Sequence, residues 1–364
     1  MCGIIGVIAN DPAAPMLVDG LRRLEYRGYD SAGVATLDHG AIGCRRAPGK
    51  LNNLDEKLRA EPLAGVVGIG HTRWATHGVP NETNAHPHVA GRVAVVHNGI
   101  IENFRALRAE LAQKGVTFAS QTDTEVVAHL LDDLLEQGLS IEKAMVALMG
   151  KIEGMFSLAF LIAGDEEVLV GARRGAPLAV GWGKGEMFLA SDAIALAPFT
   201  QQVSYLDEDD FVVVRRDGAT FFDAKGNRVQ RAPVNTQLSG ASIGKGNHRH
   251  FMEKEIYEQP TAVGETLARY LDPVAREVRL PGLESDLAAV PRITLVACGT
   301  AYYAALIGKY WLEQVGRMPV EVDVASEFRY RNAPMPEDGM AIFVSQSGET
   351  ADTLAALNYA RSQG

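Results

Sequence analysis

The second residue of the chain is a cysteine, and it opens an apolar run over residues 2–9 that suits a buried strand. An initiator Met is normally removed before a small residue, so we expect Cys2 to become the N-terminus. Its thiol would then share one residue with a free α-amine, whose reference pKa of ~7.7–8.0 lets it accept a proton near neutrality. Many cysteines are only small buried hydrophobes. The position ahead of Gly-Ile-Ile-Gly favours a nucleophile linked covalently to its own base.

Composition narrows the class of protein. The chain has 364 residues, of which 47% are hydrophobic and 22% charged, as in ordinary globular proteins of two or three domains. Lys plus Arg is 35 and Asp plus Glu is 45, which gives a net charge of −10 and disfavours nucleic acid or an anionic membrane as a partner. Three cysteines provide no disulfide framework, and neither a secretory signal nor a membrane span is visible, so we expect a cytoplasmic protein.

The first two thirds of the chain mixes strands and helices. Short β-branched runs predict strands at residues 66–69, 93–96, 157–163 and 168–172, and strands and turns continue over 188–222. Leucines at helical spacing follow the first strand, and helices are predicted at 103–114 and 123–137. Thr122 and Glu125 fit a capping box for the second of these, and Gly138 ends it. Sheets flanked by helices are the expected architecture.

The pattern changes near residue 238. A stretch rich in Gly, Ser and polar residues predicts a linker, and a helical lead-in follows over 251–271, so residues 238–290 are expected to connect two domains. From residue 291, strand, glycine turn and helix repeat, which is typical of a parallel α/β domain. Only two such units are present. We therefore expect that residues 291–364 are the first part of a truncated domain, and that the chain is a piece of something longer.

Several motifs together resemble one known family. They are MCGIIGVI, LRRLEYRGYDSAG, HTRWATHG, NAHPH, VVHNGIIEN, SQTDTEV, MEKEIYEQP, CGT, ASEFRYR and SQSGETADTL. In this order they resemble the glutamine amidotransferases of the N-terminal-nucleophile hydrolases, and within them the glutamine–fructose-6-phosphate aminotransferases. The resemblance implies an αββα sandwich over residues 2–237, followed by the start of a sugar isomerase (SIS) domain.

The resemblance also implies roles for single residues. Cys2 would attack the glutamine side-chain amide, while Asn98 and Gly99 form the oxyanion hole. The residues implied to bind glutamine are Arg73, Trp74, Thr76, His77 and Asp123, with Arg27 and His86 beside them. Arg73 suits the α-carboxylate because its planar fork can bond both oxygens. Asp123 suits the α-ammonium group, although on its own it would fit the first turn of a helix.

Two of these assignments have plain structural alternatives. Asn98-Gly99 between two apolar runs is also the strongest two-residue hairpin signal, and a tight turn could present the same N–H group to an oxyanion. In the SIS part, the resemblance implies that Thr300, Ser345, Gln346, Ser347 and Thr350 bind a sugar phosphate. The turns that hold them follow predicted strands and precede helices, where phosphates bind. Ala301 stands where many members have Ser.

The activity implied is the formation of glucosamine 6-phosphate and glutamate from fructose 6-phosphate and glutamine, without a cofactor, in a full-length homodimer. The Lys, Glu and His of the sugar chemistry would lie beyond residue 364. Paired histidines at 86/88 and 248/250 lack the further ligands of a zinc site, so no metal is expected. Two alternatives are an amidophosphoribosyltransferase-like glutaminase, and a sugar-phosphate-binding regulator with an inactive glutaminase half.

Overall fold

The structure, a computed structural model, describes residues 2–164, 167–236, 248, 250–272, 277–278, 280, 289–346, 348 and 350–363. The chain divides into two compact units, residues 1–244 and 245–364. Each has hydrophobic clusters of its own. Most of the Gly- and Ser-rich stretch over residues 238–250 lies outside the described residues. No helix in the described ranges is both long and apolar enough to cross a membrane.

The first unit is built on two antiparallel sheets. The first sheet has the strand order β15-β11-β9-β10-β1-β4-β2-β3, and the second β14-β13-β12-β8-β7-β6-β5. The strands of the first sheet are β1 (Gly3–Ile8), β2 (Ser31–Asp38), β3 (Ala41–Pro48), β4 (Val67–Arg73), β9 (Ala179–Trp182), β10 (Met187–Ala190), β11 (Gln202–Tyr205) and β15 (Val234–Asn235). Those of the second are β5 (His88–Ala90), β6 (Val93–Ile101), β7 (Gly154–Ile162), β8 (Leu169–Arg174), β12 (Phe211–Arg215), β13 (Gly218–Phe222) and β14 (Arg228–Val229).

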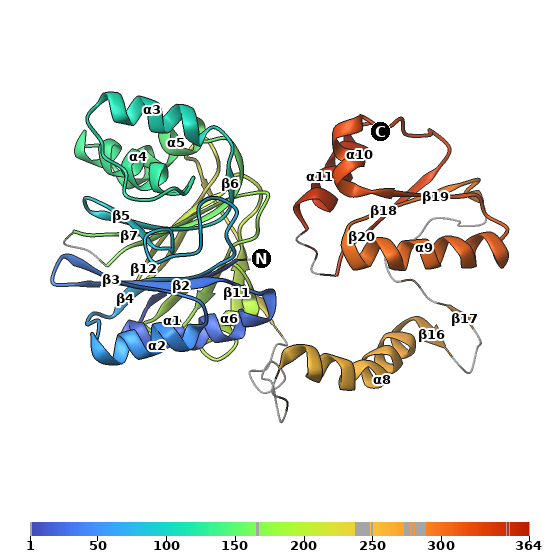
Figure 1. Ribbon diagram of the computed structural model, residues 1–364, viewed down its shortest axis with the longest axis horizontal. Helices are drawn as coiled ribbons and strands as arrows, with labels where there is room; N and C mark the ends of the chain where they lie inside the picture. Colours follow the sequence, from blue (N-terminus) through green and yellow to red (C-terminus); the bar gives the residue numbers. More distant parts are fainter. Residues whose placement is uncertain are drawn as a thin grey trace. The chain divides into compact units, whose positions relative to one another are not determined.

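Helices cover the outer face of each sheet. Figure 1 shows α1 (Ala13–Arg23), α2 (Leu51–Ala60) and α6 (Ala193–Leu196) on one side, and α3 (Phe104–Gln113), α4 (Glu125–Glu136) and α5 (Ile141–Lys151) on the other. A short 3-10 helix, η1 (Glu25–Arg27), follows α1. The order helix, sheet, sheet, helix is the αββα sandwich expected from the sequence.

Strand β1 shows why the run at the start of the chain is apolar at successive positions. Ile4 and Ile8 lie in the core between the two sheets, whereas Ile5 and Val7 pack in the core shared with α1. Alternate side chains of a strand point to opposite faces, and both faces are covered here. Burying each such side chain contributes roughly 1.5–3 kcal/mol of stabilisation.

One local prediction at the start of α4 is wrong. The capping box assigned to Thr122 and Glu125 does not form, because α4 begins at Glu125 with Thr124 as its N-cap. The Glu125 carboxylate accepts hydrogen bonds from the backbone N–H groups of Ala119 and Ser120 at 2.8 and 2.7 Å. The Thr122 hydroxyl lies 2.9 Å from His88 Nε2. Both side chains therefore bind the preceding loop and a neighbouring strand instead of capping each other.

The hairpin interpretation of Asn98-Gly99 is also wrong. Both residues lie inside β6 and pair with Ser157 and Phe156 of β7. The strand tolerates the dipeptide because Gly99 adopts a φ of +124°. An ideal Cβ at this position would lie 2.0 Å from the carbonyl oxygen of Met155. Gly99 is thus required by the close approach of β7 and not by a turn.

The second unit contains a small parallel sheet of order β19-β18-β20. Its elements are β18 (Ile293–Ala297), α9 (Gly299–Gln314), β19 (Val320–Val324), α10 (Ala325–Arg331), β20 (Met340–Val344) and α11 (Ala351–Ser362). Before them come α8 (Phe251–Tyr270) and the short pair β16 (Leu271–Asp272) and β17 (Glu277–Val278). The expected repeat of strand, turn and helix is confirmed. Helix α10 was not anticipated.

The first prediction concerns Gly99. Replacing Gly99 with Ala should lower the free energy of unfolding by more than replacing Gly138 with Ala. Gly138 also has a positive φ, +82°, but nothing lies within 4 Å of its ideal Cβ, so Gly138→Ala should cost only the ~1–2 kcal/mol of the left-handed backbone. Gly99→Ala carries a backbone clash as well. Urea unfolding of both variants measures the difference, and equal losses would contradict the packing argument.

Candidate active site

The space between the two sheets changes from apolar to polar at one end. On β4, Val67 and Ile69 belong to the apolar inter-sheet core. By strand alternation His71 and Arg73 share their face, and both are buried. On β6, Ala94 and Val96 belong to the same core, and Asn98 continues that face. Cys2 precedes β1 on the same side as Ile4. Three strands thus place polar side chains at one end of a dry interior.

The Cys2 thiol lies against the loop after β4. Its Sγ accepts a hydrogen bond from the backbone N–H of Trp74 at 3.2 Å. Burial raises the pKa of this thiol, while the Trp74 hydrogen bond and the positive charge of Arg73 act to lower it. Since burial dominates, a thiolate at this position requires a base close by.

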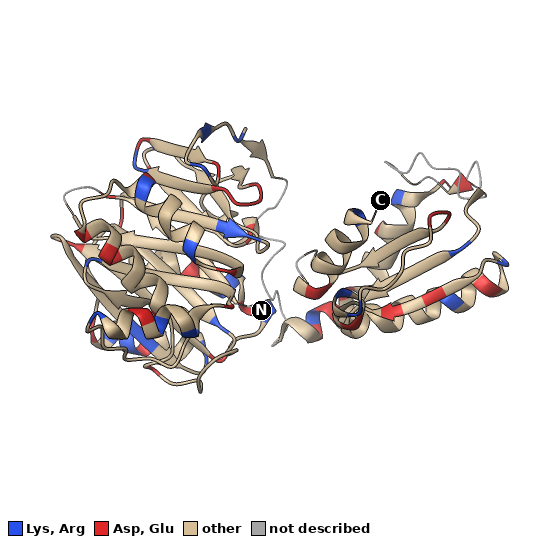
Figure 2. Cartoon of the chain, turned by 90° about the horizontal axis from the view of Figure 1, so that it is seen from above, with Lys and Arg blue, Asp and Glu red and all other residues tan. Residues whose placement is uncertain are grey.

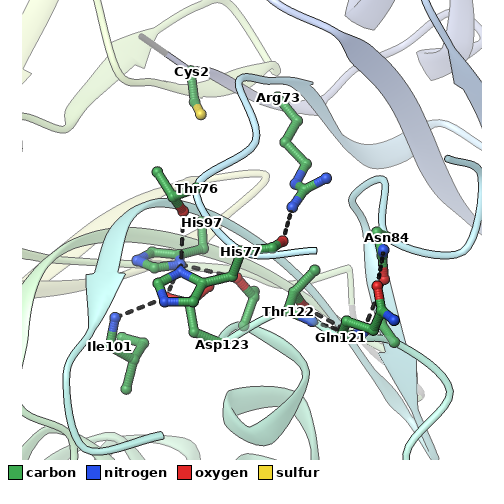
Figure 3. Close-up of polar contacts among 12 residues, drawn as sticks. Cys2, Arg73, Thr76, His77, Asn84, His97, Ile101, Gln121, Thr122 and Asp123 are labelled. Carbon is green, nitrogen blue, oxygen red and sulfur yellow. Dashed lines mark hydrogen bonds and ion pairs between the residues drawn. The ribbon is translucent and has the colours of Figure 1, made fainter. Parts of the chain in front are cut away.

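Arg73 lies beside Cys2 with one guanidinium nitrogen in use. Its Nη2 donates to the backbone carbonyl of His77, as Figure 3 shows. Its Nη1 is buried and has no hydrogen-bond partner among the residues that the structure describes. Burial lowers the pKa of the guanidinium, and nearby Asp30, Cys2 and Asp123 oppose that shift. A buried cation with a free donor is suited to hold an anionic group of a small molecule.

Asp123 lies at the edge of the second sheet, just before α4. Its Oδ2 accepts a hydrogen bond from the backbone N–H of Ile101 at 2.8 Å. The imidazole Nδ1 atoms of His77 and His97 each lie 3.9 Å from one of its oxygens. These contacts fix the carboxylate on the same side of the site as the loop that contains His77 (Figure 3).

Two predicted residues, Arg27 and His86, contact other residues of the site. Arg27 Nη2 binds Asp192 Oδ2 at 2.7 Å, and its Nη1 lies 3.5 Å from the Cys2 carbonyl oxygen. Asp192 also accepts a hydrogen bond from the Tyr26 hydroxyl. His86 is buried, with its ring centroid 4.4 Å from that of His71. Arg27 therefore contacts the backbone of Cys2, and His86 packs against a neighbour of Asn98.

The loop after β4 places Trp74, Thr76 and His77 at the rim. The Trp74 side chain is 55% exposed, and the Thr76 hydroxyl lies 3.3 Å from His77 Nδ1. The backbone N–H of Ala75 donates to Asp30 Oδ2 at 2.6 Å, which anchors the start of the loop to the first sheet. A partly exposed loop of this kind can form one wall of the site.

Four buried histidines surround the polar end of the inter-sheet space. They are His71, His86, His88 and His97. Burial lowers the pKa of all four, to about 3 for His71 and His88. They are therefore neutral near pH 7. Nowhere in the described ranges do three or more His, Cys, Asp or Glu side chains form a group that could hold a metal ion.

Sequence reasoning missed several residues that shape the site. His71 Nε2 lies 3.0 Å from Asn98 Oδ1. Asn84 and Gln121 join two loops, since Gln121 N–H donates to Asn84 Oδ1 at 2.9 Å and Asn84 Nδ2 donates to Gln121 Oε1 at 3.1 Å. All three stand inside motifs that carry the resemblance. The alternation of β4 could have singled out His71, because it places a polar residue on an apolar face.

In the second unit, the predicted phosphate residues that the structure describes follow two neighbouring strands. Ala297 of β18 pairs with Val344 of β20, so the turns after these parallel strands are adjacent. The Ser345 hydroxyl lies 3.1 Å from that of Thr350 and accepts a hydrogen bond from the Gly348 N–H. Thr300 stands exposed in the first turn of α9, and Gln346 in the other turn. Ser347 lies outside the described residues.

Two family models match the chain. A glutamine amidotransferase domain matches residues 71–198, and a SIS domain matches residues 286–364. By sequence, residues 71–198 are thus similar to glutamine amidotransferase domains and residues 286–364 to SIS domains. The first match covers most of the strands and loops around Arg73, Asn98 and Asp123, and the second covers both turns of the parallel sheet.

Curated relatives are similar over the whole chain. Proteins named glutamine–fructose-6-phosphate aminotransferase (isomerizing) are 58% identical in Brucella suis biovar 1, 57% in Bradyrhizobium diazoefficiens and 53% in Gluconobacter oxydans. Each alignment covers 100% of this chain and 60% of the relative. The chain thus spans about three fifths of the length of these relatives.

A solved structure supports the fold. The glutamine phosphoribosylpyrophosphate amidotransferase from B. subtilis matches with a TM-score of 0.56 and 18% identity, over 95% of this chain and 69% of that one. At this identity the likeness concerns the fold alone, which agrees with the N-terminal-nucleophile sandwich.

The second prediction follows from the buried histidines. Their pKa values in the folded state lie below the unfolded value of 6.5, so the unfolded chain binds more protons below about pH 6.5. The stability of the first unit should therefore fall as the pH drops from 6.5 toward 5, by up to about 1.4 kcal/mol per pH unit for each histidine. Urea unfolding across this range measures the slope.

A pair of variants isolates the cause. His88→Gln should reduce the slope of the free energy of unfolding against pH by the contribution of about one proton. His39→Gln should leave it unchanged, because the His39 side chain is 95% exposed. A flat profile between pH 5 and 6.5 in the unmodified protein would contradict the assignment of neutral buried rings.

Proposed function

We propose that the chain is the glutaminase-containing part of an enzyme that forms glucosamine 6-phosphate and glutamate from fructose 6-phosphate and glutamine. The observation that supports this best is the position of the Cys2 thiol. It lies 3.2 Å from the Trp74 N–H, at the polar end of the inter-sheet space that also contains Asn98 and Arg73. The names of the relatives supply the substrates.

The nucleophile and its base would belong to one residue. After removal of Met1, the α-amine of Cys2 takes the thiol proton, and sulfur attacks the amide carbon of glutamine. The tetrahedral intermediate collapses, and the nitrogen leaves as ammonia with the proton from the amine. Water then hydrolyses the γ-glutamyl thioester to glutamate and regenerates the thiol. Because burial raises the pKa of this thiol, an adjacent base is needed for the first step.

The developing oxyanion would be stabilised by Asn98 and Gly99. Asn98 Nδ2 already lies beside the nucleophile, 3.3 Å from the Cys2 carbonyl oxygen. Gly99 is the next residue of the same strand and has a φ of +124°, far from the usual β-strand value. Losing one such donor typically costs about 2.7–4 kcal/mol of transition-state stabilisation.

Glutamine would be held by its α-carbon substituents. The free Nη1 of Arg73 suits the carboxylate, and Asp123 suits the ammonium group. Trp74, Thr76 and His77 would close over the substrate. Arg27 and His86 would act beside the site, through the Cys2 carbonyl and the His71 ring respectively.

The second unit would bind the sugar phosphate. Thr300, Ser345, Gln346, Ser347 and Thr350 are the proposed ligands. The adjacent turns after β18 and β20 support this, since hydroxyls and helix N-termini there favour a phosphate. The ammonia released at Cys2 would aminate the ketose, and no residue of this chain is assigned to that second step.

Two alternative functions can be distinguished from the proposed one by experiment. The fold likeness to a phosphoribosylpyrophosphate amidotransferase fits an amidophosphoribosyltransferase-like enzyme. The SIS match and the whole-length similarity to the aminotransferases favour the hexose phosphate. A regulator with an inactive glutaminase half would not need the thiol, Asn98, Arg73 and Asp123 together. Glutamine labelled with 15N in its amide, given with fructose 6-phosphate, separates the three by the labelled product.

The proposed setting is the cytoplasm, with a homodimer as the assembly of the full-length protein. Basic and acidic residues are interspersed over both units in Figure 2, in keeping with a small-molecule enzyme and not a nucleic-acid or membrane partner. No cofactor enters the proposed chemistry.

The third prediction tests the nucleophile. Cys2→Ala should abolish glutamine hydrolysis while glutamine still binds, because Arg73 and Asp123 supply the binding contacts. Cys44→Ala is the matched control, a half-buried cysteine on β3 whose loss should leave hydrolysis unchanged. N-terminal sequencing of active protein should begin at Cys2. Active protein that retains Met1 would rule out the one-residue mechanism.

The fourth prediction tests recognition by Arg73. Arg73→Lys keeps a charge but loses the bidentate fork. We expect the KM for glutamine to rise at least about tenfold, the loss of one hydrogen bond to a charged group. The hydrolysis of 4-aminobutanamide, which lacks the α-carboxylate, should change little. Arg45→Lys, at an arginine paired with Glu61, is the control. Equal losses on both substrates would show that Arg73 is structural.

A further inference from the structure

The Asn98 side-chain amide is held between two groups from the other sheet. Its Nδ2 lies 3.3 Å from the Cys2 carbonyl oxygen, and its Oδ1 lies 3.0 Å from His71 Nε2. Asn98 belongs to β6 of the second sheet, whereas His71 belongs to β4 of the first. The amide therefore bridges the sheets at the polar end of the inter-sheet space.

The Cys2 carbonyl decides which way this amide faces. A carbonyl oxygen only accepts hydrogen bonds, so the amide atom beside it must be the NH2 group. The reversed amide would place two oxygens face to face. Asn98 Oδ1 is thereby directed toward His71, and an amide oxygen also only accepts. His71 must consequently present an N–H group at Nε2.

The surroundings of His71 favour that one tautomer. The ring is fully buried and neutral near pH 7, so it carries a single proton. By hydrogen-bond geometry its Nδ1 has no partner among the residues that the structure describes, whereas its Nε2 faces Asn98 Oδ1. The backbone of His97 also contributes a hydrogen bond to the ring. Contact with the His86 ring, at a centroid distance of 4.4 Å, restrains its rotation.

We infer that His71 is a positioning residue: as the Nε2–H tautomer it holds the Asn98 amide with its NH2 group toward the Cys2 side, ready for an oxyanion. This role rests on the proposed glutaminase function. His71 itself does not touch the reacting atoms. Without its N–H group, only the 3.3 Å contact with the Cys2 carbonyl oxygen would hold the amide. A rotated amide would present its oxygen to a developing negative charge, which would oppose the reaction.

Two substitutions at His71 separate the hydrogen bond from the bulk of the ring. The Gln side chain can place an N–H group where Nε2 lies, whereas the shorter Asn side chain reaches only as far as Nδ1. His71→Asn should lower kcat for glutamine hydrolysis about 100-fold with KM changed less than threefold. His71→Gln should recover at least tenfold of that loss. A merely structural role would raise KM as well and would not distinguish the two variants.

A double-mutant cycle tests whether His71 acts through Asn98. If it does, adding His71→Asn to Asn98→Ala should reduce kcat no further than about twofold, because the group that His71 positions is already gone. Independent, multiplying losses would overturn the inference.

A binding measurement supplies a second readout. The γ-aldehyde of glutamate accepts the Cys2 sulfur at its carbonyl carbon, and the thiol proton passes to the new alkoxide oxygen, which occupies the oxyanion position. His71→Asn should weaken binding of this aldehyde by at least tenfold while the Kd for glutamate stays within twofold. Weakening of both to the same extent would indicate a distorted site and overturn the role.

The tautomer can also be observed directly. In 15N-labelled protein, the ring nitrogens of His71 should show Nε2 protonated and Nδ1 bare. Protonated Nδ1 would overturn the inference whatever the activity. An unmodified chain that leaves glutamine intact would refute the proposed function, and this role with it. An active chain whose His71→Asn variant is equally active refutes the role of His71 alone.

Discussion

Pairing of β1 on both of its edges is the constraint on which the site depends. The strand pairs with β10 on one side and β4 on the other, and its two faces pack on the inter-sheet core and on α1. A chain end held in this way cannot fray without breaking two ladders and losing apolar burial on both faces. Cys2 therefore precedes a strand that is held on both edges and both faces, and its sulfur accepts a hydrogen bond from Trp74 in the loop after β4.

The polar end of the inter-sheet space is compatible with a dry core because its groups are neutral or paired. The four buried histidines have lowered pKa values and remain uncharged near neutral pH. Arg73, the charged group among them, has Asp30 and Asp123 nearby to offset its burial. Buried polar groups otherwise carry a large desolvation cost. Arg73 Nη1 is the buried charged donor at this end that has no hydrogen-bond partner among the described residues, and such a donor is suited to bind a ligand.

The two units position their candidate site residues by different sheet geometries. In the first, antiparallel strands expose alternate faces, and the site forms where one face turns polar. In the second, parallel strands bring the turns after β18 and β20 to one edge, and Thr300, Ser345 and Thr350 follow these strands. The family models match one unit each, so the two proposed chemistries correspond to two separately folded cores.

The sequence by itself determined many of the strands and the main candidate site residues. The apolar runs predicted β1, β4, β6, β7, β8 and the parallel repeat, because period and glycine punctuation are local properties. The motifs singled out Cys2, Arg73, Asn98 and Asp123. The sequence did not determine that Asn98-Gly99 lies inside a strand, since the close approach of Met155 that requires Gly99 comes from a segment more than fifty residues away. Nor did it show that Glu125 binds the loop before its helix, or that His71 and Asn98 meet across two sheets. Only tertiary structure decided these contacts, because register and sheet packing bring together residues whose local patterns carry no information about each other.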